Sequence, residues 1–497
     1  MKKLFLFSAS VVVVVLTMLS FKSSDHRDNS VTKNIIACLP GSSVNTNAVS
    51  FTTPEEPFAV MVRKNVYSLT AAEINSIKTG ITNMKALPYT NPTSWLYQAA
   101  IHGTTMPDGL PSWNTCHQPG AAFFFFAWHR MYCYFFERIL RAKSGDPNLT
   151  LPYWDYQTNP VLQPDYRNSA SGNPLYDGTR SGSINSGGSL PASIMTSIDN
   201  ALNDNIPYYD FQSDINGPHG SVHVSVGGNM SSVSTAAKDP VFWLHHCNID
   251  RLWEAWLRKC GGRKNPVDAA WLNKTYTFFD ETGAAVNMKG SDVVSTATQL
   301  NYRYDFVPPT ILCIKFPIKW YIYKRWPLIK WPIPYEINTQ LLKRNFRESK
   351  SDMLDNFIKQ RNKPRFNFAD KEAPDKLIIE MERVKVEKNP EGVIEVYLNL
   401  PANEKPDPKS KSFVGLLDLF SVSHANAHPN MRGMDSETKI ELNASRTASA
   451  LGLSIGDLKN AEISFFVRGN TMQGREIVTN ANIRIESLNF AIEEAQK

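Results

Sequence analysis

The sequence lacks several signals that would assign it to common functional classes. Its six cysteines form no CxxC unit, which excludes a zinc ribbon and a dithiol redox motif. It contains no HExxH motif, which counts against a zinc hydrolase. The formal net charge of +6 is small for 497 residues, and no RNA- or DNA-binding signature accompanies it, so no nucleic-acid partner is expected. Nothing in the sequence indicates an oligomeric state.

The N-terminus carries a long apolar run. Lys2 and Lys3 precede apolar residues 4–19, and polar residues follow. This order is typical of a secretory signal peptide, which we expect over residues 1–24 of an exported (secreted or periplasmic) protein. A retained membrane anchor is the alternative, although the run is shorter than the ~20 residues that span a bilayer. No other stretch is long and apolar enough, so no stable membrane span is expected after cleavage.

Periodicity and helix signals predict a helical first half. Two helix starts are marked by the capping box of Thr70 and Glu73 and by the Asp239-Pro240 pair. Residues 156–200 are rich in Asn, Ser, Gly and Pro and are expected to form a long surface loop. Helices are expected over residues 68–85, 94–102, 122–143, 219–227 and 239–259.

The chain is long enough for more than one domain, and alternating strands such as 376–382 and 393–400 predict a β-rich end. The predicted fold class is therefore multidomain, mainly α in the first half, with a β-rich, sandwich-like C-terminal domain. The expected divisions are an extended segment (25–60), a helical domain (61–262), a small strand-and-turn segment packed on it (263–307), a basic aromatic linker (308–370) and the β-rich domain (371–497).

Seven of the ten histidines gather in two short stretches, residues 102–129 and 219–246. His219 and His223 are spaced i, i+4, which places both rings on one face of a helix. His129 and His246 lie in aromatic helices, where an unpaired imidazole is costly to bury. Each has an ordinary alternative, such as a core histidine bonded to a carbonyl, but together they favour a pair of metal ions. Imidazole ligands suit copper, zinc, iron and nickel, so the ligand type alone does not choose the metal.

Two motifs carry a family resemblance. The stretch FFFFAWHRMYCYFFERIL (123–140) and the stretches HGSVH (219–223) and DPVFWLHHCNIDRLWEAW (239–256) resemble the two copper sites of the tyrosinase and polyphenol oxidase (catechol oxidase) family, which are type-3 dicopper proteins. Residues 271–305 and 413–487 resemble the segments that follow the copper core in that family. The resemblance implies an antiparallel four-helix bundle that holds two copper ions, with dioxygen as co-substrate.

The resemblance also implies roles for individual residues. His102, His117 and His129 would bind the first copper, and His219, His223 and His246 the second. Around these ligands, His245, Phe242, Asp250 and Asp214 would form the next layer of the site, Asp214 or Gln212 as the partner of a bound water. Arg130 and Glu137 would either support the site or form an ordinary ion pair.

Two departures from the family pattern bear on these roles. His117 and His129 are twelve residues apart where the family has nine, so the extra residues either bulge out or impair the first site. Gly220 stands where efficient monophenol hydroxylases of the family often have Asn, which favours o-diphenols. Cys116 adjoins His117, and a plain buried thiol is expected there in preference to a thioether. His424 and His428 are i, i+4, but Pro429 follows, and they are assigned no copper.

The expected function is the oxidation of o-diphenols to o-quinones with dioxygen, acting on small phenolic substrates, and hydroxylation of monophenols is left open. An oxygen-binding protein and an inactive dicopper-like protein with an impaired first site are the alternatives, and copper stoichiometry tests the inactive one. The C-terminal domain is expected either to shield the site until the chain is cut within 308–370 or to be a passive appendage.

Overall fold

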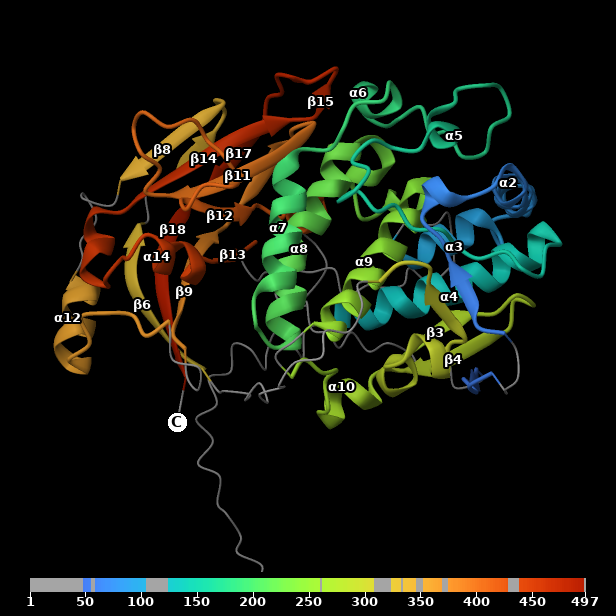
Figure 1. Cartoon of the computed structure of the whole chain (residues 1–497), viewed down its shortest axis with the longest axis horizontal. Coiled ribbons are helices and arrows are strands. Elements are labelled where there is room, and N and C mark those ends of the chain that lie inside the picture. Colours follow the sequence, from blue (N-terminus) through green and yellow to red (C-terminus); the bar gives the residue numbers. More distant parts are fainter. Residues whose placement is uncertain are drawn as a thin grey trace, which may run out of the picture.

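The computed structural model describes residues 48–54, 59–103, 124–259, 262–307, 323–331, 334–345, 352–368, 374–427 and 438–495. The expected signal peptide, Cys116, His117 and His428 lie outside these residues. The described chain has a helical part (59–307) and a β-rich part (323–495), which lie side by side in Figure 1. In the described ranges, no helix combines the length and apolar character needed to cross a membrane.

Four predicted helix starts and ends are confirmed by their caps. Helix α2 (Ala71–Lys85) begins with the full capping box of Thr70 and Glu73. Helix α9 (Pro240–Arg258) begins with Asp239, whose carboxylate accepts from the backbone N–H of Val241 at 2.8 Å. Helix α3 (Trp95–Ile101) is capped by Ser94, and α4 (Phe125–Ser144) ends at Gly145 in the left-handed conformation that glycine tolerates best.

Helix α8 (Tyr208–Val226) differs from the prediction because it begins eleven residues before His219. The run Asn216-Gly217-Pro218 is a typical turn signal, yet Pro218 lies inside the helix. A proline removes one helical hydrogen bond, but the buried side chains of Phe211, Ile215 and Val222 hold both halves of α8 in the core. Tertiary packing therefore overrides the local signal.

The range 156–200 also differs from the expected loop. It contains helices α5 (Pro164–Arg167), α6 (Gly182–Asn185) and α7 (Ala192–Asn203). The apolar residues of α7 recur at helical spacing, and Ile194, Ile198 and Ala201 are buried against the core. The polar composition of the range comes from the loops that connect these helices, and it hides the helical pattern of α7 in the sequence.

Helices α4 and α9 pack closely at the centre of the helical part. Their aromatic side chains stack in pairs, such as Phe126 on Trp253 and Phe136 on Trp243. Behind them Asp250 accepts hydrogen bonds from Arg130 at 2.5 Å and from the hydroxyls of Tyr302 at 2.6 Å and Tyr304 at 2.5 Å. This buried network ties α4 and α9 to strand β5 (Tyr302–Tyr304).

Short strands cover one side of these helices. The segment 263–307 contributes β3 (Thr275–Phe279) and β4 (Ala285–Lys289), which form a three-stranded sheet with β1 (Val49–Ser50). Strand β2 (Met61–Arg63) pairs with β5 in parallel. The segment also holds the short helices α10 (Ala269–Asn273) and α11 (Thr296–Gln299). Phe278 of β3 packs on Trp128 of α4, so the segment closes the aromatic core.

The β-rich part contains two four-stranded sheets and a three-stranded one, with strand orders β12-β11-β14-β8, β13-β9-β18-β6 and β10-β17-β7, all paired antiparallel. The strands are β6 (Tyr323–Trp331), β7 (Tyr335–Ile337), β8 (Leu341–Asn345), β9 (Lys376–Glu382), β10 (Lys385–Lys388), β11 (Gly392–Leu398), β12 (Phe413–Leu416), β13 (Ile440–Asn443), β14 (Glu462–Gly469), β15 (Thr471–Met472), β16 (Arg475–Glu476), β17 (Asn482–Ile485) and β18 (Ser487–Ala495). Helices α12 (Asp352–Arg361), α13 (Leu419–Ala427) and α14 (Ser445–Ala450) complete it.

The range 308–370 was expected as a linker, and the structure differs, because β6, β7, β8 and α12 lie in it. Strand β6 pairs with β18, buries Leu328 and Ile329, and turns Lys324 and Lys330 outward. Lys324 and Lys330 are thus exposed positions of a strand at the edge of its sheet, and Lys324 lies over the ring of Trp326.

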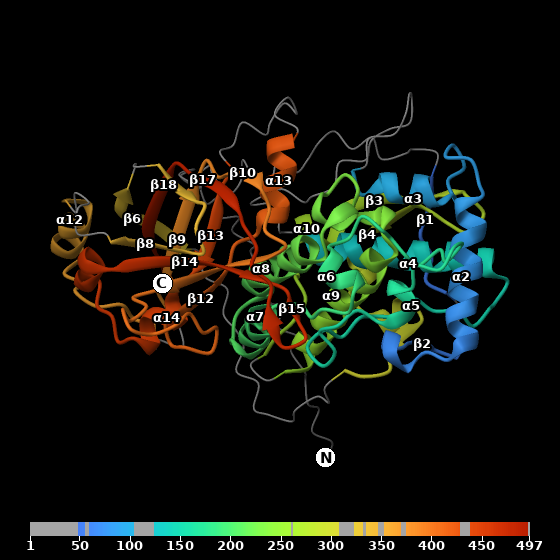
Figure 2. The same ribbon diagram turned by 90° about the horizontal axis from the view of Figure 1, so that it is seen from above.

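Helix α8 joins the two parts. Figure 2 shows it between the helical core and the β-rich part, next to α13. Lys376 of β9 forms an ion pair with Asp210 of α8 at 2.8 Å. Ser189 and Thr471 exchange two backbone hydrogen bonds of 2.7 and 3.0 Å across the same boundary. These contacts fasten the β-rich part to the helical part.

Candidate metal centre

Six histidines converge from four helices in the interior of the helical part. His102 is the C-cap of α3 and His129 lies on α4. His219 and His223 lie on α8, and His245 and His246 are consecutive on α9. All six are at most 3% exposed. The i, i+4 spacing on α8 places both rings on the same face, as the sequence predicts.

The histidines form two groups that share His246. One group holds His102, His129 and His246, and the other holds His219, His223, His245 and His246. Within each group the nitrogen atoms that can bind a metal lie within 4.8 Å of one another. The His129 and His246 rings stack between the groups, with centroids 4.2 Å apart.

Backbone carbonyls orient three of the rings. Nδ1 of His102 lies 2.9 Å from the carbonyl oxygen of Val233, and Nδ1 of His129 lies 2.8 Å from that of Phe125. Nδ1 of His223 lies 2.9 Å from the carbonyl oxygen of Met230. A carbonyl oxygen only accepts, so each Nδ1 carries the proton and each Nε2 presents a lone pair. Histidines that bind metals are oriented by such contacts.

This orientation brings lone pairs face to face. Nε2 of His102 and Nε2 of His129 lie 3.4 Å apart, and Nε2 of His223 and Nε2 of His246 lie 3.3 Å apart. The lone pairs of His102 and His129, whose Nδ1 atoms both face carbonyls, repel each other at this distance unless a cation lies between or beside them. Burial lowers the pKa of His129, His223 and His246 well below the ordinary value, so these rings are neutral. Neutral imidazole is the form that binds a metal.

The donor set suits copper. Each group consists of imidazoles alone, without a carboxylate, and the rings lie among aromatic side chains. Imidazole-rich sites without carboxylates bind copper well among the common metals. The residues therefore fit a pair of copper ions, one in each group.

Aromatic rings wall the site. Phe242, which the sequence predicts beside the site, lies with its centroid 4.3 Å from that of His246 and 4.7 Å from that of His102. The ring centroid of Phe125 lies 4.7 Å from the ring centroids of both His129 and His219. These rings exclude water and strengthen electrostatic interactions within the site.

Phe420 of α13 completes the wall, and the sequence did not indicate it. Its ring stacks on His223 with centroids 3.8 Å apart and planes 8° apart, and it meets the His219 ring edge-on at 5.8 Å. Phe420 is fully buried. It lies in the β-rich part, far along the chain from the histidines, and no local pattern distinguishes it from a core phenylalanine.

The structure places the remaining predicted residues in different surroundings. His245 stacks on His219 at 5.2 Å, and burial lowers its pKa to about 3. Asp250 lies one turn after His246 and anchors α9 through Arg130. Gln212 accepts from the backbone N–H of Phe126 at 3.1 Å and so joins α8 to α4.

Asp214 is placed away from the histidine groups. Its charged neighbours are Asp204, Asp210, Lys376 and Arg446, at the boundary with the β-rich part. Burial, followed by the repulsion of Asp210 and Asp204, raises the pKa of Asp214 to about 8. Asp214 therefore lies at the boundary between the helical and β-rich parts and not among the histidines.

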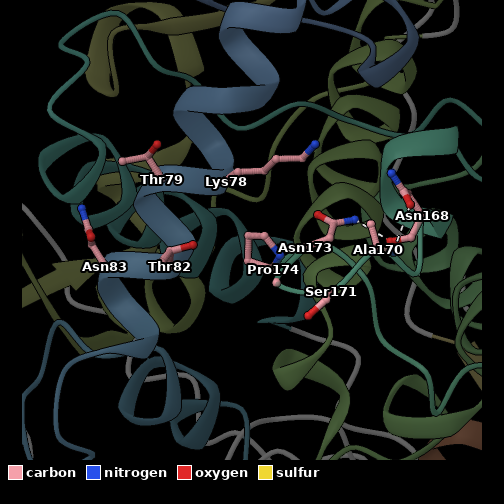
Figure 3. Close-up of a pocket in the computed structure, with 10 residues that line it drawn as sticks. Lys78, Thr79, Thr82, Asn83, Asn168, Ala170, Ser171, Asn173 and Pro174 are labelled. Carbon is pink, nitrogen blue, oxygen red and sulfur yellow. Dashed lines mark hydrogen bonds between the residues drawn. The ribbon is translucent and has the colours of Figure 1, made fainter.

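A surface cavity of about 440 Å³ lies elsewhere, between α2 and the residues that follow α5. Figure 3 shows Lys78 and Thr82 of α2 facing Asn173 and Pro174 across it. The cavity is lined by none of the six histidines. It is thus separate from the candidate metal centre.

Comparison with known families assigns most of the chain. Residues 92–192 and 185–259 match the common central domain of tyrosinase, and residues 265–317 match the polyphenol oxidase middle domain. Residues 340–485 match a domain of unknown function. The first match contains every histidine described above, and the resemblance stated from the sequence is confirmed.

Individual relatives come from bacteria and plants. A tyrosinase of Hahella sp. (strain CCB-MM4) is 32% identical over 299 residues, which cover 49% of this chain and 62% of that protein. The chloroplastic (+)-larreatricin hydroxylase of Larrea tridentata is 24% identical, covering 85% and 78%. The chloroplastic latent polyphenol oxidase of Prunus armeniaca is 27% identical, covering 54% and 52%. The chain thus spans between about half and three quarters of these relatives.

Solved structures share the fold of the whole described chain. A latent aurone synthase (polyphenol oxidase) aligns with a TM-score of 0.62 at 21% identity, covering 92% of this chain and 93% of that one. A latent apple tyrosinase aligns with a TM-score of 0.55 at 20% identity, covering 90% and 99%. The arrangement of a helical core beside a β-rich C-terminal region is therefore that of polyphenol oxidases.

The prediction of an exported protein is corrected by these comparisons. The plant relatives, including the polyphenol oxidases of Ipomoea batatas and Vitis vinifera, are chloroplastic and not secreted. The apolar N-terminal run after Lys2 and Lys3 does not by itself establish secretion. Because a bacterial tyrosinase is also among the relatives, we assign no compartment.

Proposed function

Because residues 92–317 place the chain in the tyrosinase and polyphenol oxidase family, we propose that it oxidises o-diphenols to o-quinones with dioxygen. Two copper ions are the cofactor of this family. The observation that carries the proposal is the pair of buried, neutral imidazole groups whose Nε2 atoms face one another. A bound cation makes that arrangement favourable.

We propose that α3, α4, α8 and α9 form the bundle that holds the metal. His102 and His129 bind the first copper together with His117, and His219, His223 and His246 bind the second. When bound, the copper ions supply the redox chemistry that passes electrons from the phenol to dioxygen. His245 stacks against His219 and keeps its ring in place.

The protein positions the ligands and excludes water. The carbonyls of Phe125, Val233 and Met230 hold three rings with Nε2 pointing inward. Phe242 and Phe125 provide apolar surfaces on which a phenol ring can stack. Gly220 offers no side-chain donor to a water beside the second group, which supports a preference for o-diphenols over monophenols.

The test is copper content followed by oxygen uptake. The chain is loaded with copper, its copper is counted by mass spectrometry, and oxygen uptake is measured with 4-tert-butylcatechol and with 4-tert-butylphenol. We expect two coppers per chain and faster uptake with the catechol. His246→Ala should lose copper, whereas His428→Ala, which has no proposed role, should keep it. One copper or none in the unaltered chain, or reversible oxygen binding without quinone, would overturn the proposal.

We further propose that the β-rich part shields the site. Phe420 occupies the face of His223 on which a substrate ring would stack, and this supports the shield. Two polyphenol oxidases with the same fold are described as latent. The passive alternative predicts that Phe420 can be removed without effect on access.

A further inference from the structure

Helix α8 has two glycines one turn apart, and each lies against the segment that carries Phe420. A Cβ atom at Gly217 would lie 2.9 Å from the carbonyl oxygen of Leu416, and one at Gly220 would overlap Oδ1 of Asp418. The Gly220 position would also be 3.3 Å from Cβ of Phe420. Neither glycine has the positive φ that would itself require glycine. Glycine in a helix interior is unfavourable, so the close approach is the reason for both.

The two elements match in register. Residues 217, 220 and 223 follow one another at intervals of three along α8, and they meet Leu416, Asp418 and Phe420, at intervals of two. The first two positions of α8 are glycines, and the third is His223, on which Phe420 stacks. The contacts therefore run continuously from the end of β12 to the histidines.

The facing atoms are held in place from their own side. The backbone N–H of Leu417 donates to the carbonyl of Ile394 at 3.0 Å, which fixes the end of β12 to the sheet. The Asp418 carboxylate accepts from the hydroxyl of Ser421 at 2.7 Å and from its backbone N–H at 3.3 Å. A side chain at 217 or 220 would thus have to displace the whole segment, because its neighbours cannot turn aside without losing these bonds.

We infer that Gly217 and Gly220 form the receptor surface by which α8 holds residues 416–420 over the histidines. The inference rests on the shield proposed above and names its docking site. A methyl group at either position would lift the segment, and Phe420 with it, from His223. The helix itself would not be weakened, because alanine favours a helix more than glycine does. Loss of docking with an intact helix is the distinguishing signature.

The experiment uses the full chain without copper, so it does not depend on metal binding. Amide hydrogen exchange of residues 413–423 and the rate of histidine modification by diethyl pyrocarbonate are compared among variants. Gly217→Ala and Gly220→Ala should each raise both rates by about tenfold or more, with no faster exchange in residues 208–226. Ser213→Ala, an exposed change on the same helix, should leave both rates unchanged.

A double variant supplies the rescue. In Gly220→Ala with Asp418→Ala the overlapping carboxylate is gone, so both rates should return toward those of the unaltered chain. Unchanged rates in both glycine variants, or faster exchange throughout α8, would overturn the inference. If Phe420→Ala exposes the histidines and the glycine variants do not, the shield stands and the receptor surface fails. If none of them does, both fail.

Discussion

Replacing Phe420 with alanine tests the shield directly. The Phe420 ring is fully buried and stacks on His223 with centroids 3.8 Å apart. Removing a buried phenylalanine side chain costs about 3–5 kcal/mol, of which the aromatic stack contributes about 0.5–1.5 kcal/mol. Opening the shield breaks these same contacts, so the variant should open more easily by a comparable free energy. If two thirds of this 3–5 kcal/mol applies to opening, the ratio of open to closed molecules rises about 30- to 300-fold.

The assay is the initial rate of oxygen uptake by the copper-loaded enzyme at low catechol concentration. This rate should rise in proportion to the open fraction, until the open form predominates. Phe465→Ala is the matched control, because Phe465 is equally buried in the β-rich part but lies on β14. It should lower the thermal midpoint similarly without raising the rate. Equal rates in the unaltered chain and in Phe420→Ala, with equal losses of stability in both variants, would refute the shield.

Three further predictions follow from the site and its surroundings. His246→Ala and His223→Ala should each reduce copper binding at the second group and leave the first copper bound, as copper counting will show. Asp250→Asn should lower the free energy of unfolding by about 3–5 kcal/mol in urea titrations, since it removes the buried carboxylate charge that pairs with both Arg130 and Arg63; unchanged stability would contradict this. Asp214 has a pKa raised to about 8, so it stays protonated in the folded chain while the unfolded chain ionises near pH 4. The loss of folding stability caused by burying Asp214 is therefore absent below pH 4 and complete above pH 8. Asp214→Asn should raise the free energy of unfolding by about 1–3 kcal/mol at pH 8 and leave it unchanged at pH 4. A gain that does not depend on pH would contradict that assignment.

The sequence carries most of the information about the histidines. The spacing of His219 and His223, the aromatic helix around His129 and the cap at Asp239 are all local patterns, and the structure realises each of them. The sharing of His246 between both groups could not be predicted from spacing, because it depends on how α4 and α9 cross. His117 lies outside the described residues, so its role stays a prediction.

Long-range packing accounts for what the sequence did not indicate. Helix α8 runs through Pro218 because its apolar face is buried on both sides of that residue. The sequence of β6 is that of a basic linker, and only its pairing with β18 makes it a strand. In the sequence nothing separates Phe420 from an ordinary core residue. Only the packing of α13 against α8 brings its ring onto His223. In each case a partner distant in sequence decides the structure, and a single sequence without its fold does not reveal that partner.

The stack of Phe420 on His223 joins two segments of one polypeptide, so the proposed shield would act as a tethered inhibitor. A tethered group competes with dissolved substrate at an effective concentration on the order of millimolar, whatever the amount of protein in solution. An intact chain would therefore stay closed on dilution. A phenol would have to compete with the Phe420 ring of the same chain for the site. Cutting the chain between the helical and β-rich parts would turn this closure into ordinary bimolecular binding. The same contact would then release on dilution, and activity would depend on protein concentration.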